Sequence, residues 1–140
     1  MTQIELPPRP APKPEVELES YWAAASDGHI GIGRCGGCRK VFLPPQKVCP
    51  QCWSSDIAVE AASGCGTVEA VSVVHRHSSP AFKARLPYAI VLVRLDEGVA
   101  LTSSIVDIDP DQVSIGMRVT AEFEATADGT RIPLFAPEAS

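Results

Sequence analysis

The sequence predicts a mainly β protein that consists of a short N-terminal helix, a four-cysteine metal ribbon and a small five-stranded barrel. Two observations carry this prediction. Four of the cysteines form two pairs, Cys35 with Cys38 and Cys49 with Cys52, and each pair has two residues between its members. Five runs of β-forming residues, separated by turn signals, then follow within residues 67–135.

Residues 1–14 are rich in proline and are predicted to be an extended, mobile arm. A helix is predicted over residues 15–28, because Pro14 suits a helix start and acidic residues in the first turns favour the helix dipole. Gly28 is a natural end. The side chains that share one face of this helix are Leu18, Tyr21, Trp22 and Ala25. We expect this face to pack on the protein's own body, and a partner protein that covers it is the alternative.

Residues 29–62 are predicted to form the metal ribbon. A two-residue gap lets one tight turn aim both thiolates of a pair at a single ion, and the ten residues between the pairs allow a hairpin that brings the turns face to face. The predicted ligands are Cys35, Cys38, Cys49 and Cys52. A tetrahedral set of four thiolates suits Zn²⁺ best, and it leaves no open position for water or substrate. The predicted zinc is therefore structural.

Other uses of paired cysteines fit the sequence less well. A thioredoxin-like site needs a βαβ pattern, which the sequence lacks. Disulfides need an oxidising compartment, and the N-terminus does not resemble a signal peptide, so we expect a cytoplasmic protein. A rubredoxin-like iron centre, which could carry electrons, uses the same four ligands and stays open as an alternative to zinc.

Residues 63–137 are predicted to form the barrel, after a turn at residues 63–66. The predicted strands are residues 67–77, 88–95, 99–105, 118–124 and 130–135. In the first strand, the side chains expected on one side are Val68, Ala70, Ser72 and Val74. A polar segment at residues 107–113 makes a longer connection between the third and fourth strands. This pattern matches a small Greek-key barrel of the OB type.

Charge is distributed unevenly along this chain, which has a formal net charge of −5. Residues 28–55 and 70–95 each contain four basic residues and no acidic residue. In the first segment, the bases either offset a negative zinc–thiolate cluster or form an anion site. In the second segment, the alternatives are a solvated loop and an anion site. No apolar run approaches the roughly 20 residues that span a membrane.

Several short motifs occur in a characteristic order: Tyr21-Trp22, Arg34-Cys35-x-x-Cys38, Phe42-x-Pro44-Pro45, Cys49-Pro50-x-Cys52, Gly64-x-Gly66-Thr67-Val68, Leu86-Pro87-Tyr88, Ile115-Gly116-Met117-Arg118-Val119 and Pro133-Leu134-Phe135-x-Pro137. Over residues 15–137 the chain resembles the bacterial and archaeal family named domain of unknown function thirty-five. This family is described as a rubredoxin-like zinc ribbon plus an acyl-CoA-associated OB fold. One departure is Trp53, because such ribbons usually place glycine after the last cysteine, where the backbone often needs a positive φ.

The resemblance implies a non-catalytic subunit of an enzyme complex. Members of this family accompany thiolase-like enzymes, hydroxymethylglutaryl-CoA synthases or aldolases of steroid side-chain degradation, and some are fused to hotdog-fold hydratases. The implied partner is a thiolase-fold subunit that carries the active site, in a hetero-oligomer. The small subunit is then expected to dock this partner and to help hold or pass the acyl-CoA.

The segment at residues 75–87, between the first two barrel strands, is the predicted contact with CoA. The phosphates of CoA call for arginine and lysine beside a surface for adenine and pantetheine. OB folds often bind ligands with this loop. The predicted contacts are Lys83, Arg85, Arg76 and Phe82, with Lys83 and Arg85 as the phosphate ligands.

No catalytic residue is predicted in this chain. Its three histidines are expected to be surface or strand residues, and Cys65 is expected to be a small turn residue because it lies in no nucleophile motif. The alternative function is a nucleic-acid-binding protein built from a zinc ribbon and an OB fold. Single-strand binders of that kind use basic grooves with stacked aromatic residues, whereas residues 96–140, which include the third to fifth predicted strands, contain nine acidic residues and two basic residues. We therefore expect no nucleic-acid partner.

Overall fold

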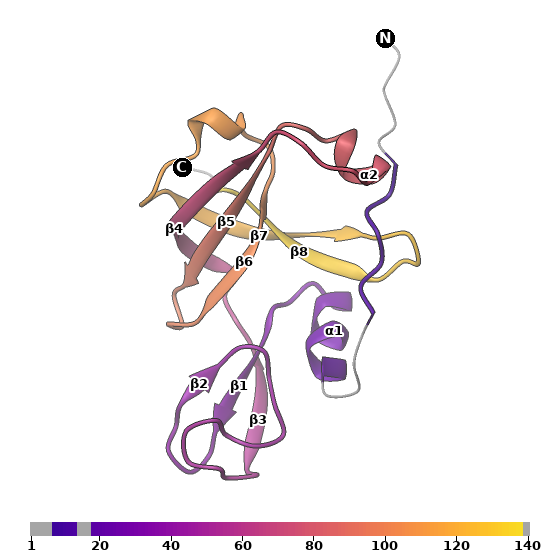
Figure 1. Cartoon of the computed structure of the whole chain (residues 1–140). Coiled ribbons are helices and arrows are strands. Elements are labelled where there is room, and N and C mark those ends of the chain that lie inside the picture. Colours follow the sequence, from indigo (N-terminus) through magenta and orange to yellow (C-terminus); the bar gives the residue numbers. More distant parts are fainter. Residues whose placement is uncertain (1–6, 14–17, 139–140) are drawn as a thin grey trace.

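The computed structural model describes residues 7–13 and 18–138. Figure 1 shows the barrel above the ribbon, with helix α1 beside the junction between them. The elements in chain order are α1 (Glu19–Ser26), β1 (Gly31–Cys35), β2 (Val41–Phe42), β3 (Ile57–Ala61), β4 (Cys65–Val74), α2 (Pro80–Lys83), β5 (Tyr88–Leu95), β6 (Ala100–Ile105), η2 (Pro110–Gln112), β7 (Arg118–Ala125) and β8 (Arg131–Pro137). The mainly β fold class that the sequence predicts is confirmed.

Helix α1 ends at Ser26, two residues before Gly28, which has a φ of 82° that glycine adopts without a steric penalty. Its predicted first residues, 15–17, lie outside the described residues. On the predicted apolar face, Tyr21 and Ala25 are buried, and Leu18 and Trp22 are half-buried. The tyrosine belongs to the main hydrophobic core, so this face packs on the protein's own body, as expected.

The ribbon is a three-stranded antiparallel sheet in the order β2-β1-β3. At its centre, Gly33 pairs with Phe42, and a Cβ at this glycine would lie only 2.4 Å from the phenylalanine ring. The absence of a side chain at Gly33 therefore lets the ring cover the sheet. Cys35, Phe42 and Cys49 form a small buried cluster, separate from the main core.

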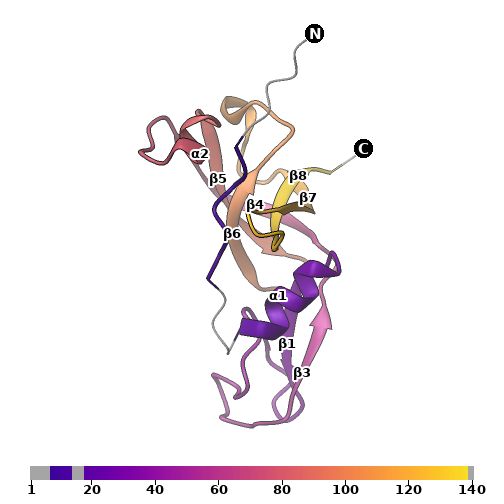
Figure 2. The same cartoon turned by 90° about the vertical axis from the view of Figure 1, so that its right-hand side faces the viewer.

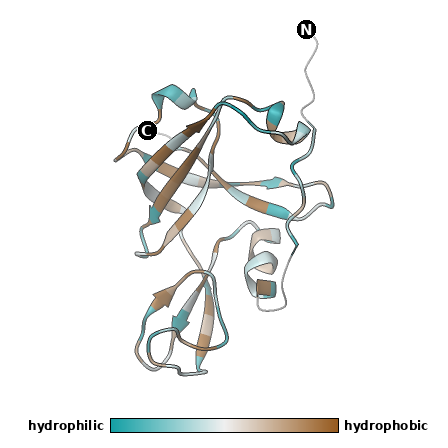
Figure 3. Ribbon diagram, viewed as in Figure 1, coloured by the Kyte–Doolittle hydropathy of each residue, from teal (hydrophilic) through white to brown (hydrophobic). Residues whose placement is uncertain are grey.

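The barrel closes in the order β4-β5-β6-β8-β7, with β7 returning to pair with β4. The β6–β8 pair is parallel, and the other pairs are antiparallel. This strand order is that of an OB fold, which confirms the predicted barrel. The longer connection between β6 and β7 contains the short helix η2, which Figure 3 shows as hydrophilic, in contrast to the hydrophobic strand β5.

The predicted alternation along the first barrel strand is wrong beyond Val68. The register against β5 shifts between Val68 and Ala70, which marks a β-bulge. An extra residue in one strand reverses which side chains face inward. Val68 is accordingly buried, Ala70 and Ser72 are exposed, and Val71 packs against the core. The strand also ends at Val74 and leaves residues 75–77 in the loop.

One hydrophobic core joins the barrel to the base of the ribbon. The barrel contributes Val91, Val93 and Phe135, which are inaccessible to solvent. Ile30 and Ile32, at the start of the ribbon, belong to the same cluster. Each Å² of apolar surface buried in this shared core contributes roughly 25 cal/mol to stability, so the base of the ribbon and the barrel stabilise each other.

Residues 7–13 lie along the barrel beside α2 and the β7–β8 hairpin (Figures 1 and 2). Arg9 is only 7% exposed, and its Nε donates a hydrogen bond to Glu124. The backbone of the same segment is held by Ala127, whose N–H donates to the carbonyl oxygen of Arg9 at 3.0 Å. These contacts differ from the mobile arm that the proline content predicts. The reason is an ion pair between residues 115 positions apart, which local composition does not reveal.

Within the described residues, no helix combines the length and apolar character needed to cross a membrane.

Candidate functional site

The first cysteine pair forms a tight turn at the end of β1. The Sγ atom of Cys35 accepts hydrogen bonds from the backbone N–H groups of Gly37 at 3.3 Å and Cys38 at 3.4 Å. The N–H of Arg39 donates to the carbonyl oxygen of Cys35 at 3.0 Å. The N–H of Cys38, followed by that of Gly37, lowers the pKa of the Cys35 thiol to about 6. This turn therefore favours the thiolate form that a metal requires.

The second cysteine pair repeats the same hydrogen-bond pattern. The Sγ atom of Cys49 accepts from the N–H groups of Gln51 at 3.4 Å and Cys52 at 3.5 Å. The N–H of Trp53 donates to the carbonyl oxygen of Cys49 at 3.0 Å. The two turns are thus equivalent halves of one site.

The two turns bring all four predicted ligand atoms together. The sulfur atoms of Cys35, Cys38, Cys49 and Cys52 lie within 4.8 Å of one another. Across the site, Cys35 Sγ lies 3.5 Å from Cys52 Sγ, and Cys38 Sγ lies 3.6 Å from Cys49 Sγ. A tetrahedral zinc with Zn–S bonds of about 2.3 Å would separate its sulfur ligands by about 3.8 Å. The residues present therefore fit a structural Zn²⁺ site with no open coordination position.

The predicted CoA contacts do not all lie together. The ring of Phe82 packs at a tilt against those of His77 and Tyr88, with ring centroids 4.7 Å and 6.0 Å away. Arg76 and Lys83 are exposed to solvent. Of the three predicted basic contacts, Arg85 lines a cavity to which Arg76 and Lys83 do not contribute.

That cavity has a volume of about 360 Å³ and lies between the β4–β5 loop, the end of β6 and the N-terminal segment. Arg9 and Arg85 both line it, together with Tyr88 and Ser104. Burial, followed by the positive charge of Arg9, lowers the pKa of Arg85. Sequence reasoning missed Arg9, although its position between Pro8 and Pro10 indicates a restrained backbone that could present the side chain.

The chain was compared with known families and proteins. Residues 22–58 match the family described as "ChsH2, rubredoxin-like zinc ribbon domain", and residues 59–124 match "ChsH2, C-terminal OB-fold domain". A "DUF35 domain-containing scaffold protein" of Methanocaldococcus jannaschii is 36% identical over 104 residues, which cover 73% of this chain and 73% of that protein. The chain belongs to the DUF35 family. The resemblance that the motif order indicates is thereby confirmed.

Two further relatives of this DUF35 chain are named after enzymes. A "Probable enoyl-CoA hydratase alpha subunit" of Thermomonospora curvata is 35% identical over 128 residues, or 90% of this chain, but this chain spans only 40% of that relative's length. Among solved structures, a chain of "Ltp2-ChsH2(DUF35) aldolase" is 33% identical, with a TM-score of 0.82 over 91% of this chain and 98% of that chain. A DUF35 protein of Sulfolobus solfataricus has a TM-score of 0.59 at 15% identity, which shows the fold alone.

Trp53 takes a left-handed backbone conformation that favours glycine, at the position where the sequence departs from the pattern expected of such ribbons. Its φ is 67°, and Arg39, the equivalent residue of the first turn, has a φ of 64°. A non-glycine residue in this region costs about 1–2 kcal/mol. The second turn nevertheless forms with the same hydrogen bonds as the first, and the indole, which is 81% exposed, gains little burial in return.

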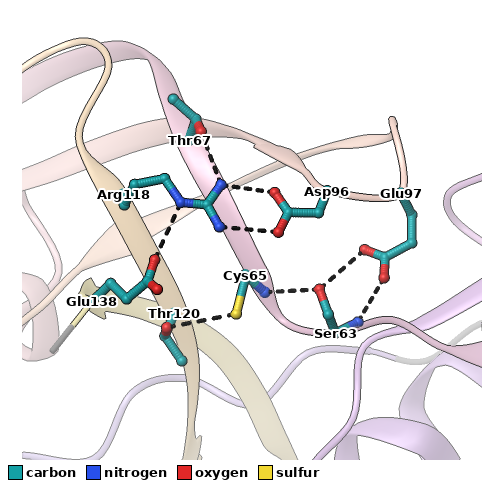
Figure 4. Close-up of polar contacts among 8 residues, drawn as sticks. All are labelled: Ser63, Cys65, Thr67, Asp96, Glu97, Arg118, Thr120 and Glu138. Atoms are coloured by element: carbon teal, nitrogen blue, oxygen red, sulfur yellow. Dashed lines mark hydrogen bonds and ion pairs between the residues drawn. The ribbon is translucent and has the colours of Figure 1, made fainter. Parts of the chain in front are cut away.

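Cys65, the fifth cysteine of this DUF35 chain, lies in a strand and not in the predicted turn, because β4 begins at this residue. Figure 4 shows its Sγ facing the hydroxyl of Thr120 at 3.9 Å, and its N–H donates to Ser63 Oγ at 3.2 Å. The nearby guanidinium of Arg118 is engaged by both carboxylate oxygens of Asp96, at 2.7 Å and 3.0 Å. The contacts of Cys65 among the described residues thus include no general base, which fits a structural role.

Proposed function

We propose that the chain is a non-catalytic, acyl-CoA-associated subunit that docks a thiolase-like partner, either a thiolase or a retro-aldolase, and helps hold or pass the acyl-CoA substrate. The observation that carries this proposal is the match to nearly the whole of a chain from a structure named after both Ltp2 and ChsH2(DUF35). A relative named as a subunit of an enoyl-CoA hydratase supports a role beside enzymes of CoA thioesters.

The metal centre supports a division of labour between the two subunits. Four thiolates fill the coordination shell of a tetrahedral ion, so the site stabilises the ribbon and offers no position to a substrate. The reaction then takes place in the partner, and this chain contributes binding surfaces. The β4–β5 loop, with Lys83, Arg85, Arg76 and Phe82, stays our proposed contact with CoA.

The ribbon has the surface that we propose meets the partner. Among the described residues, the exposed large hydrophobic side chains are Val48, Trp53, Val59 and Ile115, and all but the last lie on the ribbon. Three exposed basic residues of the ribbon, Arg39, Lys40 and Lys47, form no ion pair within the described part of the chain. Exposed apolar side chains together with these basic residues fit a partner surface that combines an aromatic-binding pocket with acidic residues.

Replacing Trp53 by glycine is expected to weaken binding of the thiolase-like partner by about 10-fold or more, because a buried tryptophan is a typical hot spot of an interface. Glycine adopts the positive φ of this position without strain, so the variant keeps the second turn intact. The affinity is measured by titration calorimetry with the purified partner. Ile115→Ala, which removes an exposed apolar side chain outside the ribbon, is the control. Unchanged affinity of Trp53→Gly would rule out this docking surface.

The proposed function is tested by an affinity pull-down of the tagged full chain from its native host, with mass spectrometry of the bound proteins. We expect a thiolase-fold protein in stoichiometric amount. Recovery of RNA, or of ribosomal or polymerase proteins in its place, would contradict the proposal and favour the nucleic-acid alternative.

A further inference from the structure

The cavity beneath the N-terminal segment combines two arginines from distant parts of the chain. Arg85 comes from the loop before β5, and Arg9 comes from the segment that crosses the barrel (Figure 2). The remaining wall includes the hydroxyl-bearing residues Tyr88 and Ser104 and the apolar residues Pro87 and Ile105. The cavity therefore offers several hydrogen-bond donors beside an apolar surface.

Of the two arginines in this cavity, Arg9 is paired with a carboxylate, whereas Arg85 has no such partner within the described part of the chain. The side chain of Arg9 is 9% exposed and pairs with Glu124, which is 43% exposed. Arg85 forms no ion pair with a carboxylate among the described residues, and its Nη1 donates to the carbonyl oxygen of Ala81 at 2.7 Å. The lining contains two acidic residues: Glu124 pairs with Arg9, and Asp107 is exposed to solvent and forms no ion pair within the described residues.

A bound anion would give Arg85 the charge partner that it lacks among the described residues. Burial, followed by the positive charge of Arg9, lowers the pKa of Arg85, and like charges that are partly buried repel each other more strongly than in water. The planar guanidinium fork matches the oxygens of a phosphate group better than any other side chain does. A volume of about 360 Å³ holds a phosphate with part of a nucleotide, but it is smaller than most sites for a whole cofactor.

We propose that Arg9 and Arg85 together bind a phosphate group of the CoA thioester, so that the N-terminal segment is part of the ligand site. This inference rests on the proposed function, because that function supplies CoA as the ligand. It adds Arg9, which comes from outside the β4–β5 loop, and it separates Arg85 from Arg76 and Lys83, which do not line the cavity.

The test measures binding of CoA, adenosine 3′,5′-bisphosphate, pantetheine and inorganic phosphate to the isolated full chain by calorimetry or NMR titration. A charge-assisted hydrogen bond contributes enough that Arg85→Ala and Arg9→Ala are each expected to weaken CoA and bisphosphate binding by about 10-fold or more. Pantetheine, which lacks the nucleotide phosphates, should bind equally to all variants. The control is Arg94→Ala, which removes an exposed arginine that pairs with Glu69 on the barrel.

Each outcome decides for or against the site. Equal loss in Arg85→Ala and Arg9→Ala, with Arg94→Ala unchanged, supports it. CoA binding that is absent, or that is insensitive to both variants, overturns it. Binding of CoA no tighter than that of inorganic phosphate also overturns the assignment to CoA. The partner found in the pull-down is measured independently, so loss of this site and loss of the proposed function are distinguishable.

Discussion

Replacement of Cys49 by serine is expected to unfold the ribbon and to leave the barrel folded. The buried cluster of the ribbon consists of Cys35, Phe42 and Cys49, with Ile57 packed against it. Such a small cluster cannot offset the conformational entropy of ordering the turns, which is roughly 1–2 kcal/mol for each residue. Metal coordination must therefore supply most of the folding free energy of this part, and structural zinc contributes about 10–16 kcal/mol in small domains.

The barrel is expected to survive because its core does not depend on the metal. Val91, Val93 and Phe135 are packed within the closed sheet, and the base of the ribbon at Ile30 and Ile32 belongs to this same core. Unfolding should therefore stop near the base of β1. The variant then has the secondary structure of a barrel with a disordered insertion.

Three measurements check this expectation. The zinc content of Cys49→Ser should fall from about one ion per chain to nearly none, since serine is a poor zinc ligand. Amide exchange should become fast at residues 35–57 and stay slow in β5. Chelation of the wild-type protein should produce the same pattern. Cys65→Ser is the matched control, because Cys65 lies outside the metal site. Retention of zinc and of slow exchange by Cys49→Ser would contradict a four-cysteine structural site.

The metal site was predictable because the short spacing of its cysteines in the sequence determines which thiolates can bind one ion. Two residues between the cysteines of each pair suffice to place both thiolates on one turn, whatever the rest of the chain does. The barrel strands were predictable for a similar reason, since runs such as residues 88–95 are largely apolar and end at turn-forming residues. These features depend on neighbours in the sequence.

The features that the sequence did not predict depend on distant contacts. The bulge between Val68 and Ala70 is a feature of the pairing with β5, and no residue type in β4 predicts it. Arg9 lies within a proline-rich segment that local composition assigns to a mobile arm, yet its carboxylate partner is on β7. The candidate phosphate site depends on that contact. This explains why the sequence predicted Arg85 as a ligand residue but did not predict Arg9.

Replacement of Phe135 by alanine is the second substitution with a large expected effect, a loss of about 3–5 kcal/mol in the free energy of unfolding. Phe135 is inaccessible to solvent and pairs with Ile105, where β6 and β8 run parallel and close the barrel. Its carbonyl oxygen also accepts a hydrogen bond from Val106 N–H at 2.7 Å. A domain of this kind is stable by only about 5–15 kcal/mol, so the loss is a large share of the total.

The matched control for Phe135→Ala is Phe123→Ala on the neighbouring strand β7. Phe123 is half-buried, with its ring 5.4 Å from the guanidinium of Arg131, and its removal should cost about 1 kcal/mol. Urea unfolding followed by circular dichroism measures both changes. Similar losses in the two variants would mean that the β6–β8 closure contributes no special stability. Ile105 and Val106 also line the cavity that contains Arg9 and Arg85. Phe135→Ala, which weakens the contact between β6 and β8, should therefore lower the affinity for CoA as well, whereas Phe123→Ala should leave this affinity unchanged.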